Sequence, residues 1–360
     1  MNDHLDGFDH RGTGATGRTN MLNGVYSEVT ASWEPSTANP RSGANAMHMA
    51  TAAITRSVIR RFYKTQGFKK FLGHAWYIPA LPDQSYRWCF CQFLTSSNIP
   101  IVSFTLSTTG QLQILIGDTA SASGGEVVAA EGEAGDFVPG IYQHVECMGF
   151  VNGASSSAEV RVNGVVAASV SGIDLGSTPI AQWTIGRTRT NNDGVNNVDV
   201  DDQRAGDDLG GVNDDFMGDK AVHTDMADAD GPIQEFTPSS GGDAFAMVDE
   251  IPPDGDTTHV ESTTPGNLCQ ITFPDLPAGV ASVLGIAYEV SARKTDIGPA
   301  DLAINVVSGA ERELGQEQAL NLAYEYLPLQ CFDEDPEINA PWQPASVNAS
   351  ICELEHAATS

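Results

Sequence analysis

The 360-residue sequence is poor in positive charge, with 18 lysine and arginine residues against 47 aspartates and glutamates and a formal net charge of −29. Lysine is the scarcest charged residue, with five copies. Recognition of a phosphate backbone requires a basic surface, so this composition argues against nucleic-acid binding. It argues against binding to anionic membrane surfaces for the same reason.

Long apolar runs are also missing, because no stretch approaches the ~20 residues of a transmembrane helix. The N-terminal segment MNDHLDGFDHRG is polar and acidic and shows no secretory signal. We therefore expect a soluble acidic globular protein. The chain is long enough to bury a sizeable hydrophobic core.

Catalytic signatures are absent from the sequence. It contains no GxSxG elbow, no HExxH, no P-loop and no glycine-rich dinucleotide motif. The nearest approach to a carboxylate pair is Asp199 and Asp201, which alternate to one face of a predicted strand. No neighbouring feature supplies the second, protonated acid that a glycosidase needs. We therefore predict that the chain is not an enzyme and leave a sandwich hydrolase as a third hypothesis.

The cysteines lack the spacing of a zinc site, since no CxxC and no cysteine–histidine cluster occurs. Without a signal peptide, six cysteines in a chain of this size favour reduced thiols in the core. They are Cys89, Cys91, Cys147, Cys269, Cys331 and Cys352.

Charge is unevenly distributed along the chain. Residues 1–120 hold ten cations and seven acids, whereas residues 121–360 hold eight cations and forty acids. Such polarity suits docking onto an acidic partner or a second copy; two separate solvated surfaces are the alternative. The candidate docking face is the basic cluster of Arg56, Arg60, Arg61, Lys64, Lys69 and Lys70.

Short β-rich runs between turn signals predict an all-β protein. Clear strands include FKKFLGHAWYIPAL (68–81), YRWCFCQFL (86–94) and YQHVECMGFV (142–151). The Asn163-Gly164 step between two β-branched runs predicts a hairpin with a type I′ turn. This succession of strands is typical of a sandwich or jelly roll.

An Asp/Gly/Asn-rich segment covers residues 188–218 and predicts a long loop around one short strand. Its carboxylates are hard oxygen ligands of the type that calcium prefers, although the spacing fits no known calcium loop. An acidic solvated loop and a calcium site both stay open. The candidate ligands are Asp201, Asp202, Asp207, Asp208, Asp214 and Asp215.

A second series of strands follows residue 226, with a short helix expected near Trp342–Pro344. Neither half repeats the other. We therefore predict a β-sandwich over residues 1–226 and a smaller β-rich domain over residues 227–360.

Several segments carry a family resemblance. DGFDHRGTG (6–14), PRSGANAMHM (40–49), YQHVECMGFVNGASSSAEVRVNGVV (142–166) and VDVDDQR (198–204) resemble virion proteins of tailed phages and viruses with a concanavalin A-like, laminin-G-like sandwich. The segments 245–266, 290–309 and 332–354 are similar to a C-terminal β domain in the same group. On this resemblance we expect strands over residues 46–63, where local propensity alone favours a helix.

The resemblance implies a structural protein of a tailed virus particle, as a head decoration, tail or fibre component. Its expected partners are other virion proteins and neighbouring copies, with host-surface glycans as a further partner, and its location is the virion. No catalytic residue and no cofactor follow from the resemblance. High aspartate with little lysine is also typical of a marine or halophilic source.

A carbohydrate-binding, lectin-like module is the alternative function, because sandwiches of this kind often bind glycans. Sugar binding requires exposed aromatic side chains or a calcium loop. The aromatic candidates are Trp33, Trp76, Trp88, Trp183 and Trp342, although most lie in alternating strands where core packing is the default.

Overall fold

The computed structural model describes residues 2–49, 57–82, 88–117, 127–187, 197–210 and 212–357. The chain divides into two compact units. The first unit consists of Met1–Leu22 and Tyr26–His223, and the second consists of Asn23–Val25 and Thr224–Ser360. The first is a concanavalin A-like antiparallel β-sandwich and the second a smaller β domain, which confirms the predicted fold class. The main division falls after residue 223, against the predicted boundary at residue 226. In the described part of the chain, no helix has the length and apolarity to cross a membrane.

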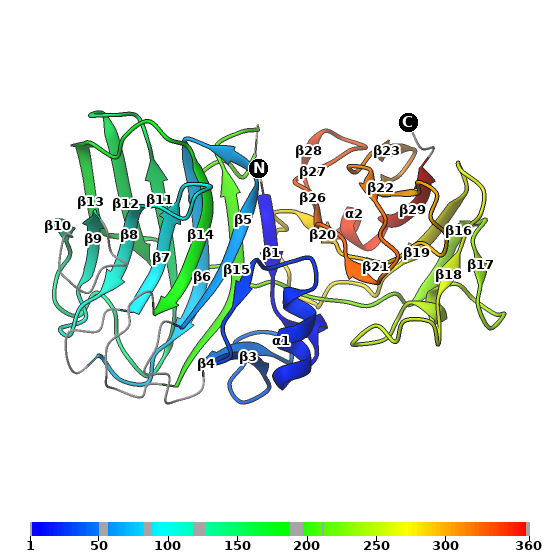
Figure 1. Ribbon diagram of the computed structural model, residues 1–360, viewed down its shortest axis with the longest axis horizontal. Coiled ribbons are helices and arrows are strands. Elements are labelled where there is room, and N and C mark those ends of the chain that lie inside the picture. Colours follow the sequence, from blue (N-terminus) through cyan, green and yellow to red (C-terminus); the bar gives the residue numbers. More distant parts are fainter. Residues whose placement is uncertain are drawn as a thin grey trace. The chain divides into compact units, whose positions relative to one another are not determined.

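Sheet A of the sandwich has eight strands (Figure 1). Strand β1 pairs with β15 at the side of the main path. In spatial order the path runs through β13 (Val165–Ile173), β12 (Ser156–Val162), β11 (Tyr142–Phe150), β6 (Lys69–Tyr77), β15 (Val198–Asp207), β4 (Ala46–Met49) and β3 (Trp33–Ser36), and β1 spans Asn2–Asp6.

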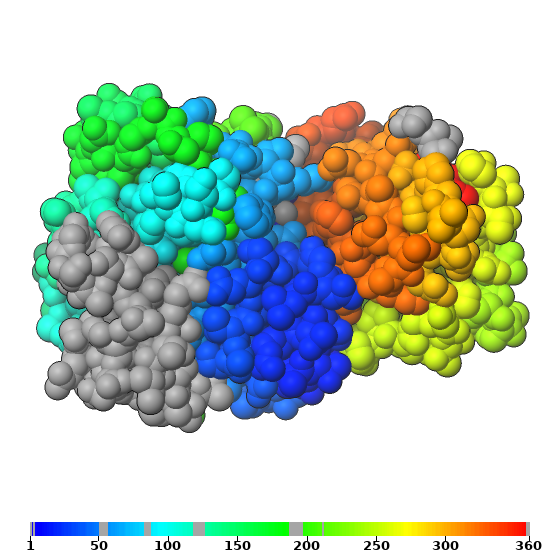
Figure 2. Space-filling model, viewed as in Figure 1, coloured from blue at the N-terminus to red at the C-terminus, as the bar shows by residue number. Residues whose placement is uncertain are grey.

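Sheet B has seven strands and lies against sheet A. Its order is β10 (Val127–Glu131), β9 (Leu112–Ile116), β8 (Pro100–Leu106), β7 (Trp88–Leu94), β14 (Ile180–Arg187), β5 (Ser57–Gly67) and β2 (Glu28–Val29). Helix α1 (Gly14–Leu22) and the 3-10 helix η1 (Asp9–Arg11) follow β1, and the sequence analysis predicted neither. In the space-filling view, the N-terminal residues and the neighbouring strands form one continuous surface (Figure 2).

Aromatic side chains fill the space between the two sheets. The Trp76 ring of sheet A lies 5.1 Å from the Phe90 ring of sheet B in an edge-to-face arrangement. Trp33, which also belongs to sheet A, packs on Trp76 with ring centroids 6.4 Å apart. All five tryptophans are buried, so the expectation that they pack in the core is confirmed. None of them offers an exposed ring to a sugar.

Two local predictions can be compared with the backbone. The β12–β13 hairpin turns at Asn163 and Gly164 with φ of 50° and 81°, which confirms the predicted turn. Within residues 46–63, the described residues form β4 and the start of β5, so strands replace the helix that propensity favours. Pairing of β4 with β3 and β15 supplies the hydrogen bonds that override local preference.

The second unit is built around a six-stranded sheet. Its strands are β16 (Ala229–Gln234), β19 (Leu268–Thr272), β29 (Ile351–Ala357), β22 (Asp301–Ser308), β23 (Glu311–Glu313) and β24 (Gln318–Ala319). Four two-stranded ladders flank it: β17 (Thr237–Pro238) with β18 (Val260–Glu261), β20 (Ile286–Tyr288) with β26 (Gln330–Phe332), β21 (Ser291–Ala292) with β25 (Glu325–Tyr326), and β27 (Glu334–Asp335) with β28 (Ala340–Pro341).

Two short helices complete this unit. The 3-10 helix η2 spans Phe245–Met247, and α2 spans Pro344–Asn348, which confirms the short helix predicted near Trp342. Trp342 is buried beside Val306 and Phe332 and donates its indole N–H to the Phe332 carbonyl at 3.0 Å.

Candidate functional site

The outer face of sheet A is identified by the strand register. Trp76 points into the sandwich, so its neighbour Tyr77 points outward. Residues directly opposite each other on adjacent strands share a face. Tyr142 of β11 and Asp199 of β15 are the partners of Tyr77, and His48 of β4 is the partner of Asp199. Four adjacent strands therefore place these side chains in one row on the outside of the sheet.

We call Tyr142, Tyr77, Asp199 and His48 the open row. Both tyrosines and the histidine are half-buried, and Glu34 of β3 extends the row beyond His48. The two tyrosine rings lie 5.6 Å apart, centroid to centroid, with their planes tilted by 47°. They form a paired aromatic surface at one end of a row that ends in ionisable side chains.

Hydrogen bonds fix the polar end of the open row. His48 Nδ1 lies 2.7 Å from Asp199 Oδ1, and Asn39 Nδ2 donates to Asp199 Oδ2 at 3.1 Å. This hydrogen bond to Asp199 raises the pKa of His48. The Tyr142 hydroxyl donates to the Asn39 carbonyl at 2.6 Å, and burial raises the pKa of that phenol. The row is thus rigid, and its imidazole titrates above its ordinary range.

Residues 213–222, which we call the strap, cover the part of the outer face around Glu146 and Phe71. Glu146 of β11 accepts the backbone N–H groups of Met217 at 2.8 Å and Gly218 at 3.0 Å. Phe216 packs edge-to-face on Phe71 with ring centroids 5.3 Å apart. The Arg161 guanidinium lies 3.9 Å from the centroid of the Phe216 ring. An aromatic anchor and a buried carboxylate therefore hold the strap against the sheet.

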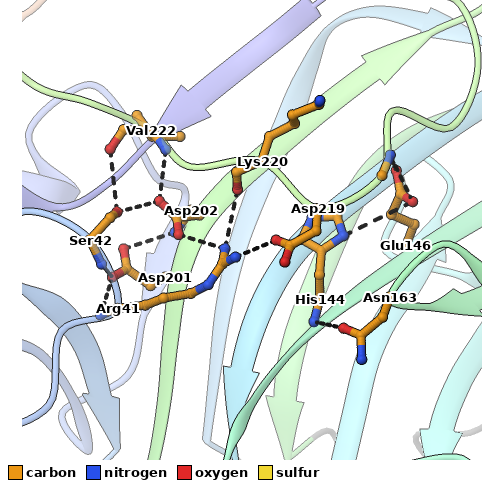
Figure 3. Close-up of polar contacts among 11 residues, drawn as sticks. Arg41, Ser42, His144, Glu146, Asn163, Asp201, Asp202, Asp219, Lys220 and Val222 are labelled. Atoms are coloured by element: carbon orange, nitrogen blue, oxygen red, sulfur yellow. Dashed lines mark hydrogen bonds and ion pairs between the residues drawn. The ribbon is translucent and has the colours of Figure 1, made fainter. Parts of the chain in front are cut away.

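Arg41 and Ser42 connect the strap to a pair of buried aspartates (Figure 3). Asp201 accepts the backbone N–H groups of Arg41 at 2.9 Å and Ser42 at 3.1 Å. Asp202 accepts the Val222 N–H at 2.7 Å and pairs with the Arg41 guanidinium at 2.8 Å. Burial, and then the neighbouring Asp202 charge, raise the pKa of Asp201 to about 7.

His144 lies beneath this cover, on the same face as Glu146. It is buried, and its Nδ1 atom has no hydrogen-bond partner. Burial lowers the pKa of His144 to about 4, so the imidazole is neutral at neutral pH.

The structure does not bring the six candidate calcium ligands together. Asp201 and Asp202 are engaged as described, and Asp207 pairs with Lys70 at 3.1 Å. These three aspartates lie in β15, a central ten-residue strand of sheet A that is longer than the short strand expected within the loop. Asp208, Asp214 and Asp215 are exposed. No group of three or more potential metal ligands of the His, Cys, Asp or Glu type occurs among the described residues. Calcium binding stays a prediction.

The candidate basic docking face is dispersed by strand alternation. Lys70 is fully buried and lies 4.5 Å from the Tyr63 ring centroid, inside the sandwich. Arg61 contacts the Tyr26 ring, while Arg60 pairs with Glu28. Lys64 is exposed on β5, and Lys69 on β6 contacts Phe71. Arg56 lies outside the described residues, and docking on an acidic partner stays a prediction.

The sequence analysis missed the open row. Its aromatic candidates were tryptophans, yet the aromatic pair on this face consists of the half-buried Tyr77 and Tyr142. Both lie in strands that were correctly predicted, and period-two alternation within each strand places them opposite the core residues. What the sequence does not contain is the register that aligns β11, β6, β15 and β4.

Comparisons with known proteins gave structural likeness only. No family model matches the chain, and no curated protein sequence matches it. Its solved neighbours include Cellulose induced protein, Cip1, at 14% identity and a TM-score of 0.37, covering 48% of this chain and 84% of that one. Alginate lyase A1-II′ of polysaccharide lyase family 7 shows 16% identity and a TM-score of 0.34, covering 50% and 84%.

Trypanosoma rangeli sialidase is a further neighbour, at 12% identity and a TM-score of 0.31. The match covers 48% of this chain and 27% of the sialidase. These likenesses concern the sandwich fold, and they assign no reaction to the chain.

The prediction that the chain is not an enzyme is contradicted by these comparisons, because its structural neighbours include alginate lyases and sialidases, which are enzymes. The prediction depended on the absence of linear motifs. On a sheet face, functional side chains come from separate strands, as they do in the open row, so a motif search cannot detect them.

Proposed function

We propose that this protein binds a glycan chain along the open row of sheet A. The observation that carries the proposal is the side-by-side pair of half-buried tyrosines, Tyr77 and Tyr142, in register with Asp199 and His48. The row crosses four strands, and neighbouring strands lie ~4.8 Å apart. It is therefore long enough to contact more than one sugar ring.

The chemistry of the row suits a saccharide. The flat, apolar faces of sugar rings pack on aromatic rings, and tyrosine offers such area at a low cost in conformational entropy. Sugar hydroxyl groups need hydrogen-bond partners of both kinds. The buried Asp199 carboxylate orients His48 and Asn39, whose half-buried side chains supply the hydrogen-bonding atoms of the row. Ligand sites typically combine an aromatic surface with a few fixed polar groups in this way.

The row also holds a group that exchanges protons. The pKa of His48 is raised by its hydrogen bond to Asp199, and 19% of the side chain remains exposed. An imidazole held by a carboxylate is a general acid–base group when a substrate bond lies within reach. Binding experiments on this protein should therefore be accompanied by a measurement of glycan cleavage.

The test compares binding of soluble oligosaccharides to wild type, Tyr77→Ala and Tyr142→Ala by titration calorimetry after a glycan-array screen. We expect each variant to bind about tenfold more weakly, the loss of ~1.4 kcal/mol that one aromatic contact provides. The matched control is Phe62→Ala, which removes a 49% exposed aromatic ring from β5 of sheet B. Equal binding by all four proteins would refute the proposal.

A virion role, predicted from the resemblance, stays a separate proposal. A glycan-binding face suits the host-surface contact expected of such a component, and assembly with other virion proteins uses different surfaces. Microscopy and mass spectrometry of purified particles test it. Absence of the protein from the particles would remove the virion role and leave the glycan proposal intact.

A further inference from the structure

We infer that the open row selects sugars without carboxylate groups, so its ligands are neutral or amino sugars and uronic and sialic acids are rejected. This inference rests on the proposed glycan binding and adds the charge class of the ligand. It follows from how the cations and carboxylates of the outer face are engaged.

Binding of a sugar carboxylate requires a cation that can turn towards it, usually an arginine with a free bidentate edge. Arg41 is the guanidinium in the loop next to the row, and both of its Nη atoms are engaged. One Nη donates to Asp202 at 2.8 Å and to the Lys220 carbonyl at 3.2 Å, and the other pairs with Asp219. The Lys220 side chain extends away from Arg41 (Figure 3).

The other arginines of this face are engaged as well. Arg204 donates through Nε to Asn2 at 2.5 Å and through Nη2 to the Asn213 carbonyl at 2.7 Å. Arg161 pairs with Glu159 at 2.7 Å and stacks on the strap. Turning any of these guanidinium groups towards a ligand would break contacts that hold the strap or the strand ends.

Carboxylates, in contrast, flank the open row. His48 is already paired with Asp199. Glu34 is next to His48 on β3, with 38% of its side chain exposed, and it forms a long ion pair of 4.0 Å with Arg18. Asp219 lies beyond Arg41 with 47% of its side chain exposed. An acidic sugar entering the row would approach these carboxylates, and the described arginines of this face are already engaged, whereas an ammonium group would be attracted.

The test measures the affinity of cellohexaose, fully deacetylated chitohexaose and a hexauronate for the full chain at low and high salt. We expect the hexauronate to bind about tenfold more weakly than cellohexaose, and chitohexaose at least as tightly as cellohexaose. The differences should shrink as salt screens the charges.

Two substitutions sharpen the test. Asp219→Asn releases one side of the Arg41 guanidinium and removes a carboxylate, so it should strengthen hexauronate binding about threefold while cellohexaose binding is unchanged. Asp174→Asn is the control, because it removes an exposed carboxylate after β13, three strands from β6. If no hexasaccharide binds, the proposed function fails. If the hexauronate binds as well as cellohexaose, or better, glycan binding stands and the inference on charge is wrong.

Discussion

The outer face of sheet A contains two regions that the same strands build in different ways. In the open row, Tyr142 and His48 are half-buried, and the buried Asp199 holds His48 by a hydrogen bond. Two residues further along the strands of Tyr142 and Asp199, His144 and Asp201 lie beneath the strap, and both are buried. The strands and side-chain types are similar, so the strap makes the difference between a binding surface and a sealed interior.

Burial beneath the strap changes which physical effect sets the pKa of a side chain. In the open row, a carboxylate raises the pKa of an imidazole, because hydrogen bonding outweighs partial burial. In the covered region, burial dominates: it raises the pKa of Asp201 and lowers that of His144. The covered groups are therefore held near neutrality, which suits a structural role, and the open groups stay available to a ligand.

The largest expected effect comes from removing the ion pair that fastens the strap. Arg41→Met leaves Asp202, whose side chain is fully buried, without its guanidinium partner. We expect a loss of about 2–3 kcal/mol in the free energy of unfolding of the sandwich, measured by urea denaturation. The control is Arg293→Met in the second unit, whose partner Asp256 is largely exposed to solvent, so its loss should have a much smaller effect. Equal effects would show that the strap is not fastened in this way.

The next effect concerns how the free energy of unfolding depends on pH, to which the covered groups Asp201 and His144 contribute with opposite signs. Asp201 has a folded-state pKa of about 7, so between about pH 4 and 7 the folded chain holds a proton that the unfolded chain has lost. This group makes stability fall as pH rises. His144 has a folded-state pKa of about 4, so between about pH 4 and 6.5 the unfolded chain holds the extra proton and stability rises with pH.

Single substitutions separate these two contributions. Relative to wild type, Asp201→Asn should give a free energy of unfolding that rises more steeply from pH 4 to 6.5. His144→Gln should give a free energy of unfolding that falls more steeply over the same range. In each variant the slope differs from that of wild type by at most about 1.4 kcal/mol per pH unit. Urea denaturation at half-unit pH steps measures both. Parallel profiles for the three proteins would contradict the burial of these groups under the strap.

The smallest effect concerns the open row. Asp199→Asn removes the carboxylate that hydrogen-bonds His48, so the pKa of His48 should fall back towards its ordinary value. An NMR titration of the histidine ring signals measures the shift. Glu34→Gln serves as the comparison, because Glu34 affects His48 through its charge alone and should shift it less. If the pKa of His48 is unchanged in both variants, Asp199 does not hydrogen-bond to His48 as described.

Much of the fold follows from the sequence, because strand alternation and turn chemistry are local. The Asn163-Gly164 turn and the strands containing Tyr77 and Tyr142 were predictable for this reason. Asp199 and Asp201 were correctly predicted on one face of a strand. Its length was not predicted, since the polarity of the flanking residues indicates a loop, whereas pairing with β6 and β4 makes residues 198–207 a central strand. Buried donors, from Arg41 and Ser42 some 160 residues away in sequence, make that burial tolerable. Such long-range partners leave no local pattern.

Hydroxyl-radical footprinting of the protein with and without its strongest array ligand tests the central claim most directly. The account predicts that the glycan protects Tyr77, Tyr142 and His48 together. Phe62 on sheet B, and Phe216 in the strap, should be oxidised equally in both conditions. Protection elsewhere on the sandwich, with the two tyrosines unchanged, would contradict the assignment of the open row as the glycan-binding surface.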